Sequence, residues 1–515
     1  MSAIANKRRR RRGRRSARGA AQDGSPKVEL PTYITRQIPC YELLGEEGLQ
    51  RLEDHAEWIL SEIGIEFRGD EEALRLFKEA GASVEGELVR FDKGHVRALC
   101  ATAPQEFKMH GRNPKRTVIF GGNRVVFAPA YGPPFVSDLD RGRRYGTIKD
   151  FENFVKLTYM TPWLHHSSGT LCEPVDIPVN KRHLDMVYAH LRYSEKPFMG
   201  AVTAPVRGED SIEMARIVFG HDFMEENCVI QGNINVNSPL VYDDTMSGSL
   251  RVYAAANQGL VISPFILGGA MGPVTQAATL AQAHAEAMVG IALSQLVRPG
   301  APVIYGNFLT TMDLKSGAPT FGTPESSLSA LAIGQLARRL GLPFRCGGHY
   351  TASKVSDAQA MQESADSMMA GIHAGANFIF QAAGWLEGGL TIGYEKFIMD
   401  IDHCGMMARY LEGLGLDDNQ LAADAFQEVG PGGNFLGATH TMANFKSANY
   451  RSEIADTNSF EQWSEDGGKD TERRAYERWK HMLNAYQAPP IDPAIDDALK
   501  EFIDKKKQSM PDEWY

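Results

Sequence analysis

PVIYGNFLTTMDLKSGAPTFGTPESSLSALAIGQLARRLGLPFRCGG, residues 302–348, decides the fold class of this chain. It begins with a short apolar run, passes through a polar segment into an amphipathic helix at residues 326–340, and returns to a second apolar run. Thr323, Pro324 and Glu325 mark the start of the helix with an N-cap, a proline in the first turn and an early acid. Short strands separated by helices predict a parallel sheet.

The same rhythm of apolar run, polar or glycine-rich exit and helix repeats along the chain. Eight such units fit a closed TIM (β/α)8 barrel, an α/β fold. The alternative is a doubly wound open sheet, but neither GxGxxG after a first strand nor GxxxxGK[ST] occurs. The expected strands begin near Trp163, Pro197, Asn227, Leu260, Pro302, Pro343, Asn377 and Asn434.

Helical extensions are expected on both sides of the barrel. Residues 31–115 read as an N-terminal helical extension and residues 451–515 as a C-terminal one. The barrel domain is expected at 116–450, opening with a hairpin at 117–127. Within it, residues 277–297 form a helix that is apolar on most faces and therefore buried.

The first 30 residues are expected to be a disordered basic tail. The chain has 515 residues with 54 basic and 64 acidic side chains, yet residues 1–20 hold nine basic residues and no acidic one. Such a tail suits a solvated arm, or weak contact with RNA, an anionic surface or a partner. Otherwise we expect no nucleic-acid partner. Twin-arginine export lacks its apolar segment after the arginines.

Cysteine use and hydropathy indicate the compartment. The six cysteines show no CxxC spacing, and no run of about 18 uncharged apolar residues occurs. These features exclude a disulfide scaffold and a membrane-spanning helix, and we expect a cytoplasmic protein.

The residues that follow the C-terminal ends of the expected strands combine neutral amides with aromatic rings. In a TIM barrel the active site lies at these strand ends. Glycines recur beside them and predict an open mouth. Aromatic faces around a cavity attract quaternary ammonium groups; the alternative is that these rings only pack the barrel end. We expect Gln231, Asn233 and His349 to be catalytic, and Tyr131, Trp163, Tyr305, Phe308, Tyr350, Gln381 and Trp385 to bind substrate.

A protein-bound metal is not expected. His165 and His166 are adjacent, so on a strand they face opposite sides, and no HExxH occurs. Cys346 with His349 nearby could act as a nucleophile, but no third group that would orient the base is visible.

Several longer motifs resemble the trimethylamine methyltransferase family. The resemblance runs from about residue 40 to 450. It is carried by YGPPF at 131–135, SP at 263–264, GGAMGPVT at 268–275, VRPGAPVIYG at 297–306, DLKSGA at 313–318 and GTPE at 322–325.

The resemblance implies a TIM barrel that takes a methyl group from a methylated amine. The acceptor would be a Co(I) corrinoid carried by a separate small protein, with no cofactor tightly bound to this chain. Archaeal trimethylamine enzymes of the family carry pyrrolysine, which this chain lacks; its equivalent position is expected within 346–351. Members without pyrrolysine resemble glycine betaine, proline betaine or carnitine methyltransferases.

The expected function is therefore demethylation of a quaternary amine, glycine betaine or a related betaine. We also expect a homo-oligomer. Two alternatives remain: direct transfer of the methyl group to tetrahydrofolate, and a non-catalytic protein that binds betaine or associates with RNA through its tail.

Overall fold

Parallel strands make up the centre of the molecule. The computed structural model describes residues 32–514, so the basic tail expected at 1–30 lies outside the described residues. In the main sheet each strand from β7 to β10 pairs in parallel with the next in the order β7-β17-β16-β14-β13-β11-β10. Their bounds are Arg124–Phe127 (β7), Phe198–Met199 (β10), Ile230–Val236 (β11), Gly259–Gly268 (β13), Val303–Gly306 (β14), Phe344–Gly347 (β16) and Phe378–Phe380 (β17).

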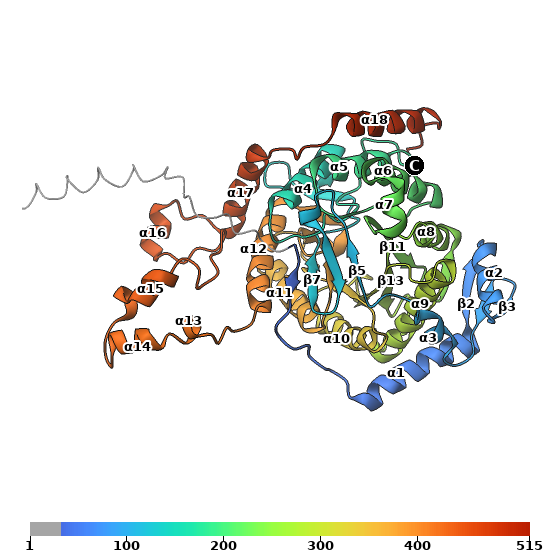
Figure 1. The fold of residues 1–515 in the computed structure, drawn as a ribbon, viewed down its shortest axis with the longest axis horizontal. Helices are drawn as coiled ribbons and strands as arrows, with labels where there is room; N and C mark the ends of the chain where they lie inside the picture. The colour runs from blue at the N-terminus through green and yellow to red at the C-terminus, as the bar shows by residue number, and fades with distance from the viewer. Residues whose placement is uncertain (1–31, 515) are drawn as a thin grey trace, which may run out of the picture. The chain divides into compact units, whose positions relative to one another are not determined.

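An irregular segment at 165–168 bridges the two ends of this sheet and closes it into a barrel. On one side the amides of His165 and His166 donate to the carbonyl of Phe127 at the end of β7. On the other side Ser167 N donates to Pro197 O, and Met199 N donates to the carbonyl of residue 168. The segment therefore fills the place of an eighth strand between β7 and β10, although it is not a regular strand. The predicted TIM barrel is confirmed, and the open doubly wound sheet is excluded (Figure 1).

Two of the expected strand assignments are wrong. The segment near Asn434 is a short 3-10 helix, η4 (Phe435–Gly437), because its apolar run is short, is flanked by glycines and has no strand beside it. The first barrel strand is instead β7, which the sequence placed in a hairpin with residues 117–120. That partner, β6 (Val118–Gly121), pairs antiparallel with β5 (Glu106–Met109).

The β5–β6 pair forms a floor across the N-terminal ends of the barrel strands. Phe107 and Phe120 pack at 5.3 Å, and Phe120 lies edge-on to Phe378 at the start of β17, at 5.1 Å. These rings join one apolar cluster with the inward-facing Val261 and Ile304. The floor explains why β6 leaves β7: its aromatic side chain is buried in the barrel end.

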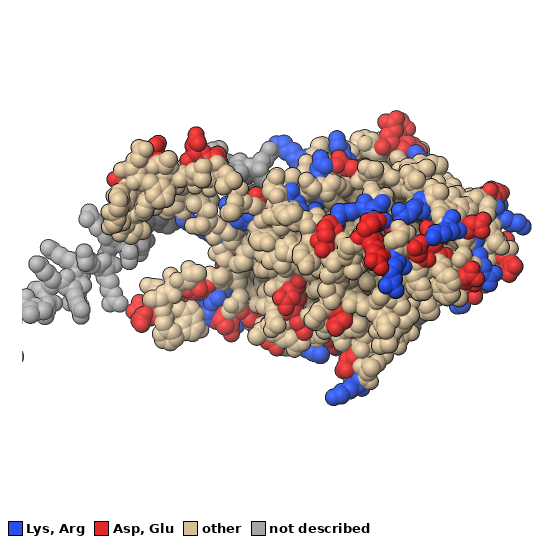
Figure 2. All heavy atoms as spheres, turned by 90° about the horizontal axis from the view of Figure 1, so that it is seen from below, with Lys and Arg blue, Asp and Glu red and all other residues tan. Residues whose placement is uncertain are grey.

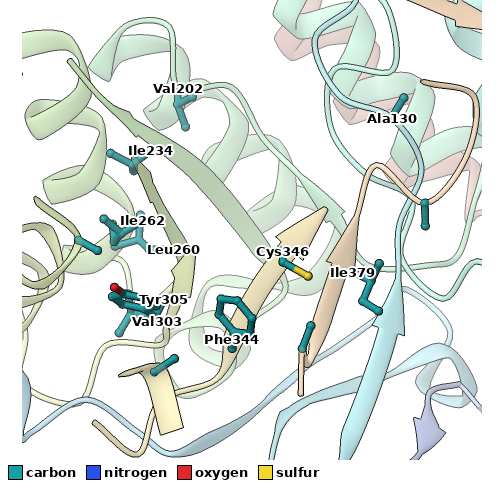
Figure 3. Packing of buried hydrophobic residues seen from close by; sticks show 14 of the residues in the cluster. Ala130, Val202, Ile234, Leu260, Ile262, Val303, Tyr305, Phe344, Cys346 and Ile379 are labelled. Atoms are coloured by element: carbon teal, nitrogen blue, oxygen red, sulfur yellow. The ribbon is translucent and has the colours of Figure 1, made fainter. Parts of the chain in front are cut away.

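Side chains on the outer face of the barrel strands pack against the surrounding helices. Figure 3 shows Ile262, Tyr305 and Val303 close together in this layer. Helix α9 is buried along most of its length, as its apolar composition predicts. The helices around the barrel are α4 (Ile148–Met160), α5 (Arg182–Tyr193), α6 (Pro205–Phe219), α8 (Asp244–Ala255), α9 (Gln276–Val297), α10 (Pro324–Arg339), α11 (Ala358–His373) and α12 (Tyr394–Leu411).

Both extensions are mainly helical. The N-terminal one has α1 (Glu46–Trp58), α2 (Glu71–Glu79) and α3 (His95–Cys100), which pack on α9. It also has three strands that the sequence did not indicate, β2 (Ile65–Arg68), β3 (Ser83–Glu85) and β4 (Leu88–Arg90), and β12 (Val241–Asp243) of the barrel domain joins their sheet beside β2. The C-terminal one has α16 (Phe460–Glu465), α17 (Thr471–Ala485), which packs on α12, and α18 (Pro493–Gln508), which packs on α5 and α6. No helix among residues 32–514 is long and apolar enough to cross a bilayer. The expected boundaries at 115 and 450 stay predictions.

Candidate active site at the barrel mouth

Polar side chains without partners line the inside of the barrel towards its C-terminal end. Gln231 and Asn233 lie on β11, Ser263 on β13, and Asn307 directly after β14. All four residues are buried, and each has a buried side-chain oxygen or nitrogen that makes no hydrogen bond. A buried polar atom without a partner costs about 1–3 kcal/mol. Such a row of unused donors and acceptors is typical of a binding site.

A buried arginine, which the sequence analysis missed, lies among these groups. Arg345 points inward from β16 and is 1% exposed. Its Nη1 donates to the carbonyl of Asn307 at 2.7 Å, and its Nη2 donates to Oε1 of Gln381 at 2.6 Å. Its Nε has no partner, and among the ion pairs of the described residues none includes Arg345. Burial lowers the pKa of the guanidinium. A buried cation without a counter-charge is costly, so this group suits an anionic ligand.

Four aromatic rings lie beside this arginine and contact one another. Phe308, at the start of β15 (Phe308–Thr311), lies 5.7 Å from Tyr350 and 6.0 Å from Trp385, centroid to centroid. Tyr350 and Trp385 are 5.1 Å apart. Phe321, which the sequence analysis did not name, completes the group at 4.9 Å from Tyr350. We call Phe308, Phe321, Tyr350 and Trp385 the aromatic cluster.

Phe308 connects the aromatic cluster to the arginine. The guanidinium carbon of Arg345 lies 5.2 Å from the Phe308 ring and 5.1 Å from the Phe380 ring. Phe308 and its neighbour Phe265 are only partly buried, and Asn235, which accepts a hydrogen bond from Asn233, is exposed. These residues mark the side of the mouth that faces solvent.

Two glycines allow the rings to pack. A Cβ added to Gly347 would lie 1.7 Å from the Tyr350 ring, and one added to Gly389 would lie 2.4 Å from the Trp385 ring. Gly389 also has φ +98°, a conformation that side chains rarely adopt. Glycine at these two positions leaves the space that the Tyr350 and Trp385 rings occupy.

The loop that carries Gln381 and Trp385 is held by α12. Gln381 has φ +52°, which is unusual for a residue with a side chain. The Asp400 carboxylate accepts from Gly384 N at 2.8 Å, and the Cys404 thiol donates to Ala382 O at 3.3 Å. These bonds fix the loop, so the side chains that it presents to the mouth are preorganised.

His349 belongs to this support and does not contact the aromatic cluster. Its Nδ1 donates to Ala382 O at 2.7 Å, and its Nε2 accepts from Nδ1 of His403 on α12 at 2.8 Å. Burial lowers the pKa of His349 well below its ordinary value, so the ring is neutral. The structure places His349 behind the loop, as a positioning residue.

The remaining aromatic residues named from the sequence lie in three different places. The Tyr131 ring lies 5.3 Å from the Phe380 ring, which is itself beside Arg345, and burial raises the pKa of Tyr131 to about 12. Tyr305 faces away from the barrel interior, and its hydroxyl donates to Nδ1 of His284 on α9 at 3.1 Å. Trp163 precedes the 165–168 segment, and its ring packs against Tyr450 at 6.1 Å. Neither Tyr305 nor Trp163 reaches the mouth.

The titratable groups of the mouth do not form a metal site. No three His, Cys, Asp or Glu side chains among residues 32–514 are grouped so that they could hold a metal ion. The thiol pKa of Cys346 is raised to about 12 by burial, which disfavours the thiolate that a nucleophile needs. The site instead offers one cation, neutral amides and aromatic faces.

The barrel mouth, with an arginine that has no ion-pair partner among the described residues and an adjoining aromatic cluster, is the candidate active site. A sequence model of the trimethylamine methyltransferase (MTTB) family matches residues 8–511. The chain belongs to this family, and the resemblance found in the sequence is confirmed, as is the expectation of a methyltransferase.

Curated relatives cover almost the whole chain. Glycine betaine methyltransferase of Desulfitobacterium hafniense (strain Y51) is 40% identical over 477 residues, which cover 92% of this chain and 99% of that protein. Trimethylamine methyltransferase MttB of D. hafniense (strain DSM 10664 / DCB-2) is 28% identical over 90% of this chain and 93% of its own. Proline betaine:corrinoid methyltransferase of Eubacterium limosum is 28% identical over 78% of this chain and 85% of its own.

Proposed function

We propose that this protein demethylates a betaine, a small molecule with a quaternary ammonium group and a carboxylate, and passes the methyl group to the Co(I) corrinoid of a separate protein. The observation that carries the proposal is Arg345, a buried guanidinium beside the aromatic cluster that pairs with no carboxylate of residues 32–514. Two of the relatives are named for glycine betaine and proline betaine, and one of these for a corrinoid.

The two ends of a betaine match the two parts of the site. The carboxylate would pair with Arg345, whose Nε makes no hydrogen bond within the described residues. The onium group would lie against the aromatic cluster, where each desolvated ring contributes up to about 2 kcal/mol. Trimethylamine has no carboxylate and would leave Arg345 unpaired, so it is a poor match for this mouth.

The bond changes need no acid or base from the protein. The cobalt electron pair attacks one methyl carbon, the carbon–nitrogen bond breaks, and its electron pair stays on nitrogen as a neutral tertiary amine. Cobalt is oxidised from Co(I) to methyl-Co(III), and no proton moves. The protein binds and orients the cation so that one methyl group faces the acceptor.

The six cysteines of the chain are all free thiols. This agrees with a reducing compartment. We place the reaction in the cytoplasm.

The test is spectroscopic. The protein is mixed with a reduced corrinoid protein and either glycine betaine, proline betaine, choline or trimethylamine, and the cobalt spectrum is followed. We expect methyl-Co(III) with a betaine and little with choline, which keeps the onium group but has no carboxylate. No methyl-Co(III) with any betaine would overturn the proposal. Methyltetrahydrofolate formed without a corrinoid protein would show that the acceptor is a folate.

A further inference from the structure

The segment at 413–450, here called the arm, extends from the end of α12. It contains α13 (Asp418–Leu421), α14 (Ala423–Val429), η4 and α15 (Thr439–Asn444). Side-chain hydrogen bonds within it join Asn419 with Asn444 and Glu428 with Thr439 N. At its C-terminal end the Tyr450 hydroxyl donates to Asp402 on α12 and ties the arm to the barrel. Figure 1 shows α13, α14 and α15 in orange, to one side of the barrel.

The arm exposes an unusual amount of apolar surface. Leu414 is 92% exposed, Leu436 79% and Phe426 65%, whereas Ala425 and Ala438 are its buried apolar residues. Monomeric proteins rarely leave contiguous apolar patches beyond a few hundred Å² in water. A segment of under 40 residues cannot build a sufficient core alone, so a partner surface is needed to cover it. The other exposed large apolar residues of the arm are Leu416, Leu421, Phe435, Met442 and Phe445.

A complementary groove lies elsewhere on the same chain. It runs between α1 and the starts of α9 and α10 and encloses about 940 Å³. Trp58 and Leu328 in its lining are 49% and 39% exposed, although both are large and apolar. No residue of the arm lines the groove, which stays open among residues 32–514 of a single chain. Its other apolar lining residues include Leu43, Leu44, Leu52 and Leu280.

Charge also complements between the two surfaces. The arm carries four acidic residues, Asp417, Asp418, Asp424 and Glu428, and one basic residue, Lys446. In Figure 2 the end of the molecule that holds the arm is drawn mostly tan. At the groove, Arg51 is exposed and makes no ion pair with the described residues, while the nearby Asp54 is paired with Lys93 at 2.7 Å.

We propose that a second copy of this chain covers these surfaces: the arm of each copy lies in the α1–α9–α10 groove of the other. Each copy of the chain has one apolar arm and one apolar groove. In a two-fold symmetric dimer both arms would therefore lie in both grooves, and neither kind of surface would stay exposed to solvent. A head-to-tail contact would instead leave one arm and one groove free and would propagate into a chain of molecules.

Sedimentation of the full-length protein tests this. We expect a dimer in the wild type, and a dimer weakened at least tenfold both in the arm variant Phe426→Asp/Leu436→Asp and in the groove variant Leu328→Asp. Val206→Asp, at a 53% exposed apolar residue of α6, is the matched control and should leave the dimer intact. Circular dichroism and melting temperature show that each variant is folded.

Cross-linking identifies the contact itself. Leu436→Cys and Trp58→Cys are made as separate variants, mixed and oxidised. We expect a covalent dimer from the mixture and much less from either variant alone. A monomeric wild type would overturn the proposal, as would a dimer that survives the arm variant. An arm variant that stays dimeric but no longer binds the corrinoid protein would also overturn it. The arm would then be the surface that binds that partner.

Discussion

The guanidinium of Arg345 and the side-chain oxygen of Gln381 lie 2.6 Å apart inside the barrel, and no carboxylate of the described chain neutralises that cation. Gln381 is itself fixed, because its backbone has φ +52° and α12 holds the residues that follow it. The charge is therefore held in one place, and an anionic end of the substrate would meet it without rearrangement.

Replacing Arg345 by methionine should abolish betaine use. The variant keeps an unbranched apolar side chain but removes the guanidinium and its charge, and truncating one partner of a buried charge pair costs about 2–5 kcal/mol. We expect kcat/KM for betaine to fall by about 100-fold or more in the corrinoid methylation assay. Arg345→Lys keeps the charge and should recover part of the activity. Unchanged kinetics in the methionine variant would show that the carboxylate binds elsewhere.

Trp385 should contribute to binding of the onium group. We expect Trp385→Leu to weaken betaine binding by up to about 30-fold, which corresponds to about 2 kcal/mol from one ring. Calorimetric titration measures the dissociation constant. Tyr305→Phe is the control, because its hydroxyl contacts His284 outside the mouth. A larger effect from Tyr305→Phe than from Trp385→Leu would contradict this assignment.

Gly347→Ala should disturb the mouth without unfolding the barrel. The new methyl group would overlap the Tyr350 ring, which would have to move away from Phe308 and Trp385. We expect about tenfold weaker betaine binding with a cooperative melting transition retained. Gly45→Ala, where a Cβ meets nothing within 4 Å, is the matched control. Equal affinity in both variants would show that the position of Tyr350 does not matter.

Acidification should destabilise the fold through buried histidines. Burial lowers the pKa of His165 to about 3, and of His190 and His284 to about 4. In the unfolded chain these histidines take up protons near pH 6.5, whereas in the folded protein they stay neutral. The free energy of unfolding therefore has its full value above pH 6.5 and decreases as the pH falls towards 4. Each ring accounts for on the order of 2 kcal/mol between pH 7.5 and 5.

The measurement is the melting temperature across that pH range. His284→Gln should show a smaller fall than the wild type, because it lacks one of the protonating groups. His221→Gln changes an exposed histidine and should follow the wild type. An identical fall in all three proteins would mean that other groups control acid unfolding.

The sequence predicts the barrel well, because its repeat of strand and helix is regular. It cannot show which face of a strand points inward, since parallel strands are apolar on both faces. Tyr305 was placed in the mouth for this reason, although Ile304 is the inward residue. Near Asn434 a short apolar run resembled a strand, and only the lack of a neighbouring strand in space excludes it.

The sequence around Arg345 does carry a signal for this residue. It is the one charged residue in the run PFRCGG, and a charge inside a buried strand needs a reason. Phe321 could not be found in this way, because it follows a polar segment and joins Tyr350 and Trp385 only through the fold.

The floor made by Phe107 and Phe120 has a consequence for the order of events. Aromatic side chains close the N-terminal end of the barrel. The substrate, the demethylated amine and the methyl acceptor would therefore all use the opening at its C-terminal end. A docked acceptor protein would trap the amine beneath it, so each turnover would end with undocking before the product escapes. An acceptor protein that cannot be methylated should then inhibit steady-state turnover, because it would block both the entry of betaine and the release of the amine.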